Sequence, residues 1–242
     1  MKKGMKIFLI VIAVFLVAAG ALAVYFRQYI DILVTGVSNS REQIILKQEK
    51  NNEKLVDEVN NYLDEKLREP TEEEKSRIES GELQLPELYA GIISERSENT
   101  YSYDSEKKEF TETPNENYTT PKKVTDTDAI VSKYMAQLYA LQSSFSAHAE
   151  SLIAQGDAYY ESLRKNEGKD KATARAETIS HFTSAVRGVQ ASCDSSVNKV
   201  CENLKAELEA VGADTSIVKT VKSAYENEKK LKLSYYANRY LK

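Results

Sequence analysis

The sequence is poor in the residues that build disulfide frameworks, histidine sites and β-rich folds. Its 242 residues include no Trp, 2 Cys, 2 His, 4 Pro and 9 Gly. Two cysteines exclude a scaffold held by several disulfides and any four-thiolate metal site. Scarce Gly and Pro, together with many Ala, Glu, Lys and Leu residues, indicate long helices and argue against a β-sandwich. We therefore expect an all-α protein.

Charge is distributed unevenly, although the formal net charge is only -4. Residues 1–27 carry four basic side chains and no acid, whereas the remainder carries 29 basic and 37 acidic side chains. Most of the acidic excess falls in residues 41–98. Because an acidic body is repelled by a phosphate backbone, we expect no nucleic-acid partner.

A long apolar run, IFLIVIAVFLVAAGALAVYF, occupies residues 7–26 without a charged side chain. As a helix it would span about 30 Å, the thickness of a bilayer's hydrocarbon core. The run predicts a single transmembrane helix, with the lipid bilayer as its partner. Three lysines in residues 1–6 place that short tail in the cytoplasm by the positive-inside rule, so the C-terminal domain is expected to be extracytoplasmic.

A cleaved signal peptide is the alternative interpretation of the same segment. Ala21-Leu22-Ala23 fits a small-x-small cleavage site, and the domain would then be secreted. The apolar run continues to Phe26 with no polar region before it ends, which favours an uncleaved anchor. Both interpretations export the rest of the chain.

Residues 27–98 are expected to form a helical stalk and short helices. Ser40 with Gln43 is a capping-box pattern that begins a helix over 41–68. Its apolar stripe is thin and its other faces are charged, which favours a stalk or a coiled-coil partner surface over a core helix. Thr71 with Glu74 is a second capping box, and Pro86 suits the first turn of another short helix.

Residues 99–127 change to a polar composition rich in Thr, Tyr, Ser, Asn and Glu. Tyr101 and Tyr103 alternate with polar residues, and Phe110 could pair back across residues 104–108. Because an isolated two-stranded hairpin is only marginally stable, the segment is expected to be a linker or a small hairpin.

From residue 128 onwards, apolar residues recur at helical spacing over three long stretches. The stripes are Val131, Leu138, Phe145, Leu152 and Tyr159; Ile179, Phe182, Val186, Val189, Cys193, Val197, Val200, Leu204, Leu208 and Val211; and Ile217, Val221, Tyr225, Leu231 and Tyr235. Short connections near Gly168 and Gly212 require antiparallel neighbours. Residues 128–242 thus predict a C-terminal antiparallel three-helix bundle, which the 41–68 helix could complete to four.

Few side chains are candidates for catalysis, metal binding or disulfide formation. Cys193 and Cys201 are about 12 Å apart along one helix, too far for a disulfide with each other, so they are either buried apolar residues or partners in an intermolecular disulfide. His148 and His181 fall at different levels of the bundle, so a shared metal site is not expected. We predict no catalytic, cofactor-binding or metal-binding residues and no cofactor.

Two further surface features have ordinary alternatives. Asp157 and Glu161 share a helix face, as carboxylates on helix surfaces routinely do. Residues 219–242 carry seven basic and two acidic side chains, which could contact anionic polymers or lipid headgroups, or form a solvated helix face. The sequence contains no G-x-S-x-G, P-loop, H-E-x-x-H or C-x-x-C motif, so we expect a protein that is not an enzyme.

These expectations describe a single-pass membrane protein with an exported helical bundle that acts as an interaction scaffold or assembly factor of the cell envelope. Its partner is expected to be another protein or a second copy, bound through helical faces. The alternatives are a sensory or ligand-binding bundle that signals through a membrane partner and, third, a cell-envelope enzyme. The six-residue cytoplasmic tail argues against the sensor, because little chain lies inside to receive a signal.

Overall fold

The computed structural model describes residues 32–241, apart from 33, 37 and 119–124. The expected transmembrane helix at 7–26, its cleavage site and the tail at 1–6 lie outside the described residues. Within the described part of the chain, no helix has both the length and the apolar character needed to cross a bilayer.

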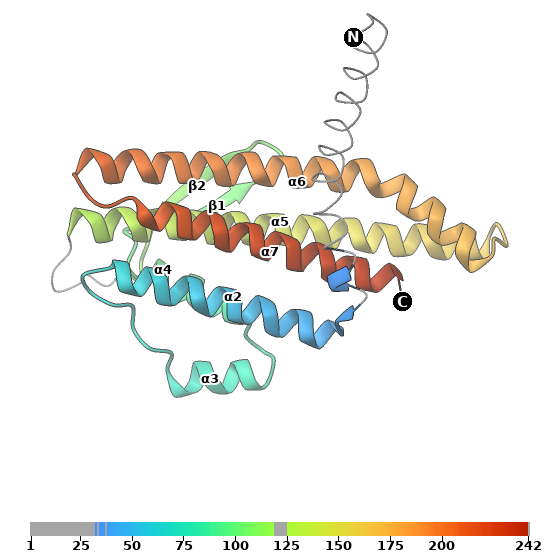
Figure 1. The fold of residues 1–242 in the computed structure, drawn as a ribbon, viewed down its shortest axis with the longest axis horizontal. Helices are drawn as coiled ribbons and strands as arrows, with labels where there is room; N and C mark the ends of the chain where they lie inside the picture. The colour runs from blue at the N-terminus through green and yellow to red at the C-terminus, as the bar shows by residue number, and fades with distance from the viewer. Residues whose placement is uncertain (1–31, 33, 37, 119–124, 242) are drawn as a thin grey trace, which may run out of the picture. The chain divides into compact units, whose positions relative to one another are not determined.

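The described chain is mostly helical (Figure 1). Its elements are α2 (Arg41–Tyr62), α3 (Glu72–Glu79), α4 (Leu85–Ser94), β1 (Asn99–Asp104), β2 (Glu109–Pro114), α5 (Asp126–Lys165), α6 (Lys171–Ala210) and α7 (Ser216–Leu241). The expectation of a mainly α-helical chain is confirmed, and two short strands form the small hairpin that was one alternative for residues 99–127. The described residues divide into a central unit, which falls within 52–225, and a terminal unit formed by those before residue 52 and those after residue 225.

Both capping boxes expected from the sequence are present. The Ser40 amide donates to Gln43 Oε1 at 2.8 Å, and the Gln43 amide donates to Ser40 Oγ at 3.2 Å. Thr71 and Glu74 make the same reciprocal pair at 2.8 and 3.2 Å. Because the first amides of a helix have no partner within it, these side chains determine where α2 and α3 begin.

Residues 99–114 form an antiparallel hairpin in which Tyr103 lies opposite Phe110. The hairpin is stabilised by contact with the long helices. The buried Tyr103 ring packs 5.7 Å from the Phe145 ring of α5, and its hydroxyl shares a 2.6 Å hydrogen bond with Ser196 of α6. An apolar face against a helix supplies the stability that two strands alone lack.

The core of the central unit combines residues from α2, α4, α5, α6 and α7 and from the hairpin. Val59 of α2, Val131 of α5, Leu204 of α6 and Val221 of α7 are all nearly fully buried in one cluster. Ile92 and its neighbour on α4 pack into the same cluster. The first two long helices, α5 and α6, run side by side, joined by a short turn at Gly168 with φ of 66° (Figure 1).

The C-terminal half of α2 is a core helix, so the expectation of a stalk is wrong for this part of the chain. Val56 and Val59 of α2, together with Leu63 and Leu67 in the segment just after it, are between 1% and 6% exposed. Burying each such side chain stabilises the fold by about 1.5–3 kcal/mol, so even a thin apolar stripe holds the helix against the bundle.

The helix α2 also ends at Tyr62, about six residues before the expected end. The buried Asp128 carboxylate accepts hydrogen bonds from the amides of Asp64 and Glu65 at 3.0 and 3.3 Å. Asn60 Oδ1 accepts from the Leu67 amide at 2.8 Å. Since these acceptors take amides that a longer helix would need, the chain turns away from the helical path at this point.

The terminal unit contains several buried polar side chains. Asn238 is 3% exposed and donates from Nδ2 to the carbonyl oxygens of Gly36 and Asn39, at 2.6 and 3.0 Å. Glu228 accepts from Gln48 Nε2 at 3.1 Å. Burial raises the pKa of the Glu228 carboxyl, and Lys232 and this hydrogen bond oppose the shift only in part.

We predict that Glu228→Gln flattens the pH dependence of stability as pH rises above 4.5, the ordinary pKa of a glutamate side chain. The raised pKa means that the protonated carboxyl is favoured in the folded state, so its stabilisation is present at low pH and is lost as pH rises through the folded pKa. At pH 8 the variant should unfold at a higher temperature than the wild type, because it has no charge to bury. The midpoint temperature should rise by about 2–4 °C for each kcal/mol by which the free energy of unfolding increases.

Thermal unfolding of the full chain, followed by circular dichroism, measures this difference. Glu226→Gln is the matched control, because Glu226 lies one half-turn away in an exposed ion pair with Lys229, at 2.8 Å. Parallel pH profiles for wild type and Glu228→Gln would show that ionisation of Glu228 does not affect folding.

Candidate functional site

The two cysteines differ in environment. Cys201 is fully buried, and burial raises the pKa of its thiol to about 11. Cys193 is half-buried and lies beside Tyr225. Because thiol exchange requires an accessible thiolate, Cys201 is unsuited to an intermolecular disulfide in the folded chain.

The histidines and the carboxylate pair form no metal site in the structure. His148 is half-buried on α5, whereas His181 is exposed on α6 and stacks on Tyr159 with ring centroids 4.5 Å apart. Glu161 forms an ion pair with Lys165 at 3.0 Å. Among the described residues, no group of three or more His, Cys, Asp or Glu side chains is arranged to hold a metal ion.

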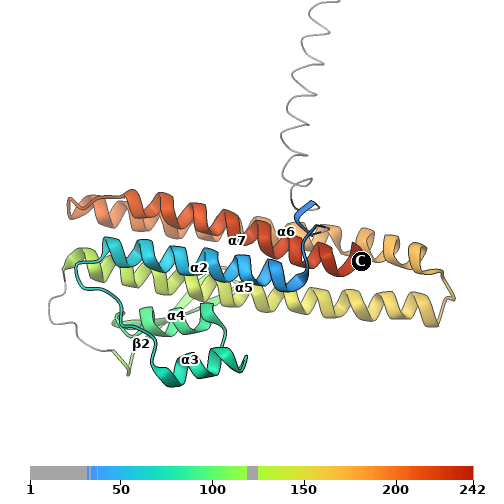
Figure 2. The same cartoon turned by 60° about the horizontal axis from the view of Figure 1, so that its bottom comes forward.

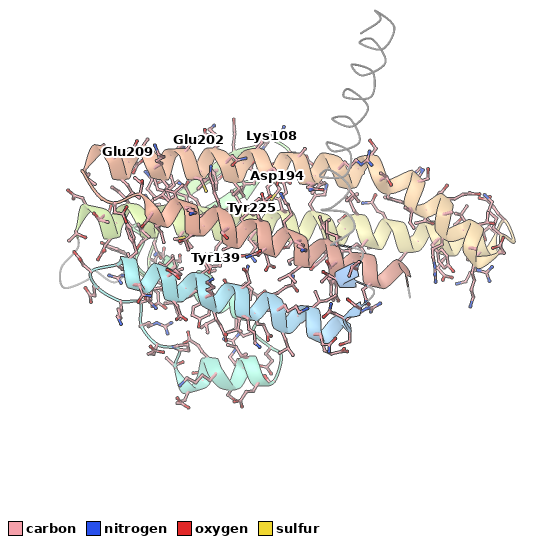
Figure 3. The ribbon with its side chains drawn as sticks, in the orientation of Figure 1. Lys108, Tyr139, Asp194, Glu202, Glu209 and Tyr225 are labelled. Carbon is pink, nitrogen blue, oxygen red and sulfur yellow. The ribbon has the colours of Figure 1, made fainter. Side chains whose placement is uncertain are left out.

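Part of the C-terminal basic and aromatic segment belongs to the fold. The Tyr225 hydroxyl donates to the Asp194 carboxylate of α6, within the central unit (Figure 3). Further along α7, in the terminal unit, Tyr235 and Tyr236 make an edge contact with ring centroids 5.6 Å apart. Tyr225 is therefore not available as a surface for anionic polymers.

Tyrosine hydroxyls join the elements of the central unit, a feature that the apolar periodicity does not reveal. Tyr134 of α5 donates to Glu207 of α6 at 2.6 Å. Tyr139 of α5 donates to the buried Asn52 Oδ1 of α2 at 3.0 Å. Each hydrogen bond can form only when its two helices are at one position along each other's axes. These hydroxyls therefore help to fix the register of the bundle. The composition contains 15 Tyr and no Trp, and this abundance of tyrosine is the only sign of these hydrogen bonds in the sequence.

The outer halves of α5 and α6 extend beyond the core as a two-helix projection, which we call the arm, residues 146–192. Figure 2 shows its tip reaching beyond α3, α4 and the hairpin. The cluster of buried residues ends at Phe145 on α5 and Val197 on α6. Within the arm, the buried residues are Gly156, Leu163, Ala174 and Thr178.

Apolar side chains on the arm are exposed where the sequence predicted core positions. Ile179 is 47% exposed and Val186 is 41% exposed, although both belong to the apolar stripe predicted for α6. These residues are seven apart, with the half-buried Phe182 between them and the half-buried Val189 three residues beyond, at coiled-coil spacing. The physical reason is that the core ends before the helices do.

The stripe lies in a stretch of α6 with few charges. Residues 178–193 carry one charged side chain at neutral pH, Arg187, although nine positions in this stretch are exposed. An aromatic group lies on the same stretch of α6, in which His181 contacts Tyr159 and Phe182 at ring-centroid distances of 4.5 and 5.0 Å, although His181 faces away from Ile179 and Val186. Few charges with exposed aromatic and apolar groups characterise the centre of a protein–protein interface.

No known protein family, curated protein or solved structure matches this chain. The interpretation of the arm therefore depends on its own geometry and composition.

We predict that Tyr139→Phe lowers the free energy of unfolding by about 1–3 kcal/mol, and that adding Asn52→Leu recovers most of it. The single change removes the hydroxyl that donates to Asn52 Oδ1 inside the core, where Asn52 Nδ2 already has no hydrogen-bond partner among the described residues. Replacing both polar partners removes the unsatisfied groups as well.

Urea unfolding of the full chain measures both variants. Tyr160→Phe is the control, because the Tyr160 hydroxyl on the same helix makes no hydrogen bond to a described residue. A double variant that is less stable than Tyr139→Phe would contradict the proposed role of this pair.

Proposed function

We propose that this chain is a membrane-anchored, extracytoplasmic interaction or assembly module of the cell envelope that performs no catalysis. Residues 7–26 would form a transmembrane anchor with its N-terminus in the cytoplasm. The helical domain would then be held at the extracytoplasmic face of the membrane. Confinement there raises the effective concentration of a partner in the same membrane.

The exposed stripe on α6 is the observation that carries this proposal. A soluble helix normally buries its apolar stripe, because each exposed apolar side chain forgoes stabilisation. Here the stripe of the arm projects beyond the core with Ile179 and Val186 exposed. A binding partner that covers the stripe would recover that free energy, as in helical recognition through side chains at i, i+3, i+4 and i+7.

The placement in the membrane is tested by protease added to intact cells that express the full chain with a C-terminal tag. We expect the tag to be lost without cell lysis, because the domain after residue 26 lies outside. A cytoplasmic protein that survives the treatment is the control for intact cells. A tag that is digested only after lysis, while other surface proteins are digested before it, would contradict the proposed topology.

Partner binding by the arm is tested with a photo-crosslinking amino acid at Val186 in intact membranes. We expect a discrete protein adduct that decreases about fivefold or more when Ile179→Ser is added, because the apolar contact is lost. Ile179 is largely exposed, so this change should alter folding stability by no more than about 0.5 kcal/mol.

The matched control carries the photo-crosslinker at Lys199, an exposed position of α6 outside the arm. Adducts of equal yield from positions 186 and 199, or an adduct at 186 that Ile179→Ser does not change, would remove the support for a binding face on the arm.

A further inference from the structure

We infer that the outer edge of the hairpin, strand β2, binds an extended basic segment of another protein, which adds to the sheet as a third strand. This edge is a second interaction surface, in addition to the stripe on α6, and it does not depend on that stripe. The backbone groups of β2 and the acidic side chains around them carry the inference.

The hydrogen-bond pattern of the hairpin directs backbone groups of β2 outwards. The Asn115 amide donates to the Glu98 carbonyl oxygen at 3.0 Å. Because hydrogen-bonded and non-hydrogen-bonded pairs alternate in an antiparallel ladder, Phe110 and Glu112 occupy non-hydrogen-bonded positions. Their N–H and C=O groups therefore point away from β1, and these groups have no hydrogen-bond partner among the described residues.

The edge has a defined length. Pro114 occupies the next outward position and has no amide hydrogen to donate. At the other end, Lys108 has a φ of 59°, in the left-handed region, which ends the extended strand. A partner strand can therefore pair with residues 109–113, where Phe110 and Glu112 each offer one donor and one acceptor.

The outer position of β2 is also evident from exposure. The strand β1 packs on α5 and is largely half-buried. In β2, every residue except the half-buried Phe110 is exposed. Strands with an open edge are the sites at which extended peptides add to a sheet.

The hairpin and α7 lie on opposite sides of α6 in the central unit. Ser196 of α6 shares a hydrogen bond with Tyr103 of β1, whereas Asp194 of α6 accepts from Tyr225 of α7. Two residues are about 200° apart around a helix, so these two contacts face in nearly opposite directions.

A similar relation holds on α5. Its Tyr139 hydroxyl donates to Asn52 of α2, whereas its Phe145 ring lies 5.7 Å from the Tyr103 ring of β1. Six residues are about 240° apart around a helix, so α2 and the hairpin also approach from different sides. These contacts place α2 and α7 away from the side on which β2 is exposed.

Charge determines which partner suits this edge. Residues 98–116 carry six acidic and two basic side chains, and residues 52–225 carry 32 acidic and 21 basic ones. A second copy would bring two acidic hairpins together, whereas a basic segment is attracted. Charges on edge strands prevent pairing with strands of like charge, and here they select a basic partner.

The side chains of β2 indicate where the basic residues of the partner lie. Along an antiparallel third strand, four consecutive residues stand opposite Glu112, Thr111, Phe110 and Glu109, in that order. Lysines opposite the two glutamates form pairs of unlike charge, and β-branched residues between them suit the strand. The expected core of the partner segment is therefore Lys-Thr-Val-Lys.

Peptide binding to the full chain in phosphatidylcholine nanodiscs tests the inference. The probe is a capped fluorescent peptide with the core Lys-Thr-Val-Lys, and the matched probe has Glu-Thr-Val-Glu instead. We expect fluorescence anisotropy to show binding of the lysine probe at least about tenfold tighter than that of the glutamate probe.

Amide exchange locates the bound probe on the chain. With isotope-labelled phenylalanine, NMR should show that saturating lysine probe slows exchange of the Phe110 amide about tenfold or more, because this outward N–H gains an acceptor. The amide of Phe145, which lies within the helix α5, is the internal control and should not change.

Glu112→Pro and Glu112→Ala form a matched pair of variants. Both remove the carboxylate, but only proline removes the outward N–H, and it leaves the ladder to β1 intact because that N–H takes no part in it. We expect Glu112→Ala to weaken binding about threefold and Glu112→Pro about thirtyfold or more. Unchanged exchange at Phe145 in both variants shows that the fold is retained.

Each contrary outcome overturns the inference. Equal binding by Glu112→Pro and Glu112→Ala contradicts the addition of a strand, and equal binding of the two probes, or of neither, contradicts a basic partner. Protection of Phe110 that rises with chain density in the absence of peptide identifies a second copy as the occupant instead. None of these results alters the adduct expected from position 186, so this edge and the binding face of the arm are tested separately.

Discussion

The antiparallel packing of α5 against α6 is the constraint on which the central unit depends. Each helix is 40 residues long, and α4 and β1 pack on α5. The inner half receives α2, α4, the start of α7 and the hairpin, which together complete a buried core. The cluster of buried residues does not extend into the outer half, where Ile179 and Val186 of the same apolar stripe are exposed.

A polar junction joins the entry of α5 to the segment that follows α2. Asp128 is buried in the first turn of α5, where the helix dipole favours a negative charge. Its carboxylate binds two backbone amides, and Arg96 lies 3.8 Å from it while donating to the Glu65 carbonyl oxygen. Burying a charge is costly unless it is paired and hydrogen-bonded, and this group meets both conditions for Asp128.

Much of the secondary structure was predictable because it depends on local chemistry. Residues close together in the chain produce the capping boxes at Ser40 and Thr71 and the long periodic stretches of α5 and α6. The end of α2 was not predictable, because it depends on a carboxylate 64 residues away at Asp128. The same is true of the hairpin, whose stability comes from Tyr103 meeting α5 and α6.

The exposure of the α6 stripe was not predictable for a related reason. Ile179 and Val186 have the spacing of core residues, and spacing reveals which side chains share a face but not whether another element covers that face. The low charge of residues 178–193 was the available signal. The tyrosine hydrogen bonds were likewise hidden, since a hydroxyl such as that of Tyr139 becomes informative only when its acceptor, Asn52, is placed beside it.

Asn238 has a mechanical consequence. Its amide holds the carbonyl oxygens of Gly36 and Asn39, just before α2 begins, to the last turns of α7. Tension that enters the chain from residues before Gly36 would reach α7 through this clamp as well as α2 through the backbone. Two helices would then share the load, and the first bonds to break under pulling would be those two hydrogen bonds rather than the turns of either helix.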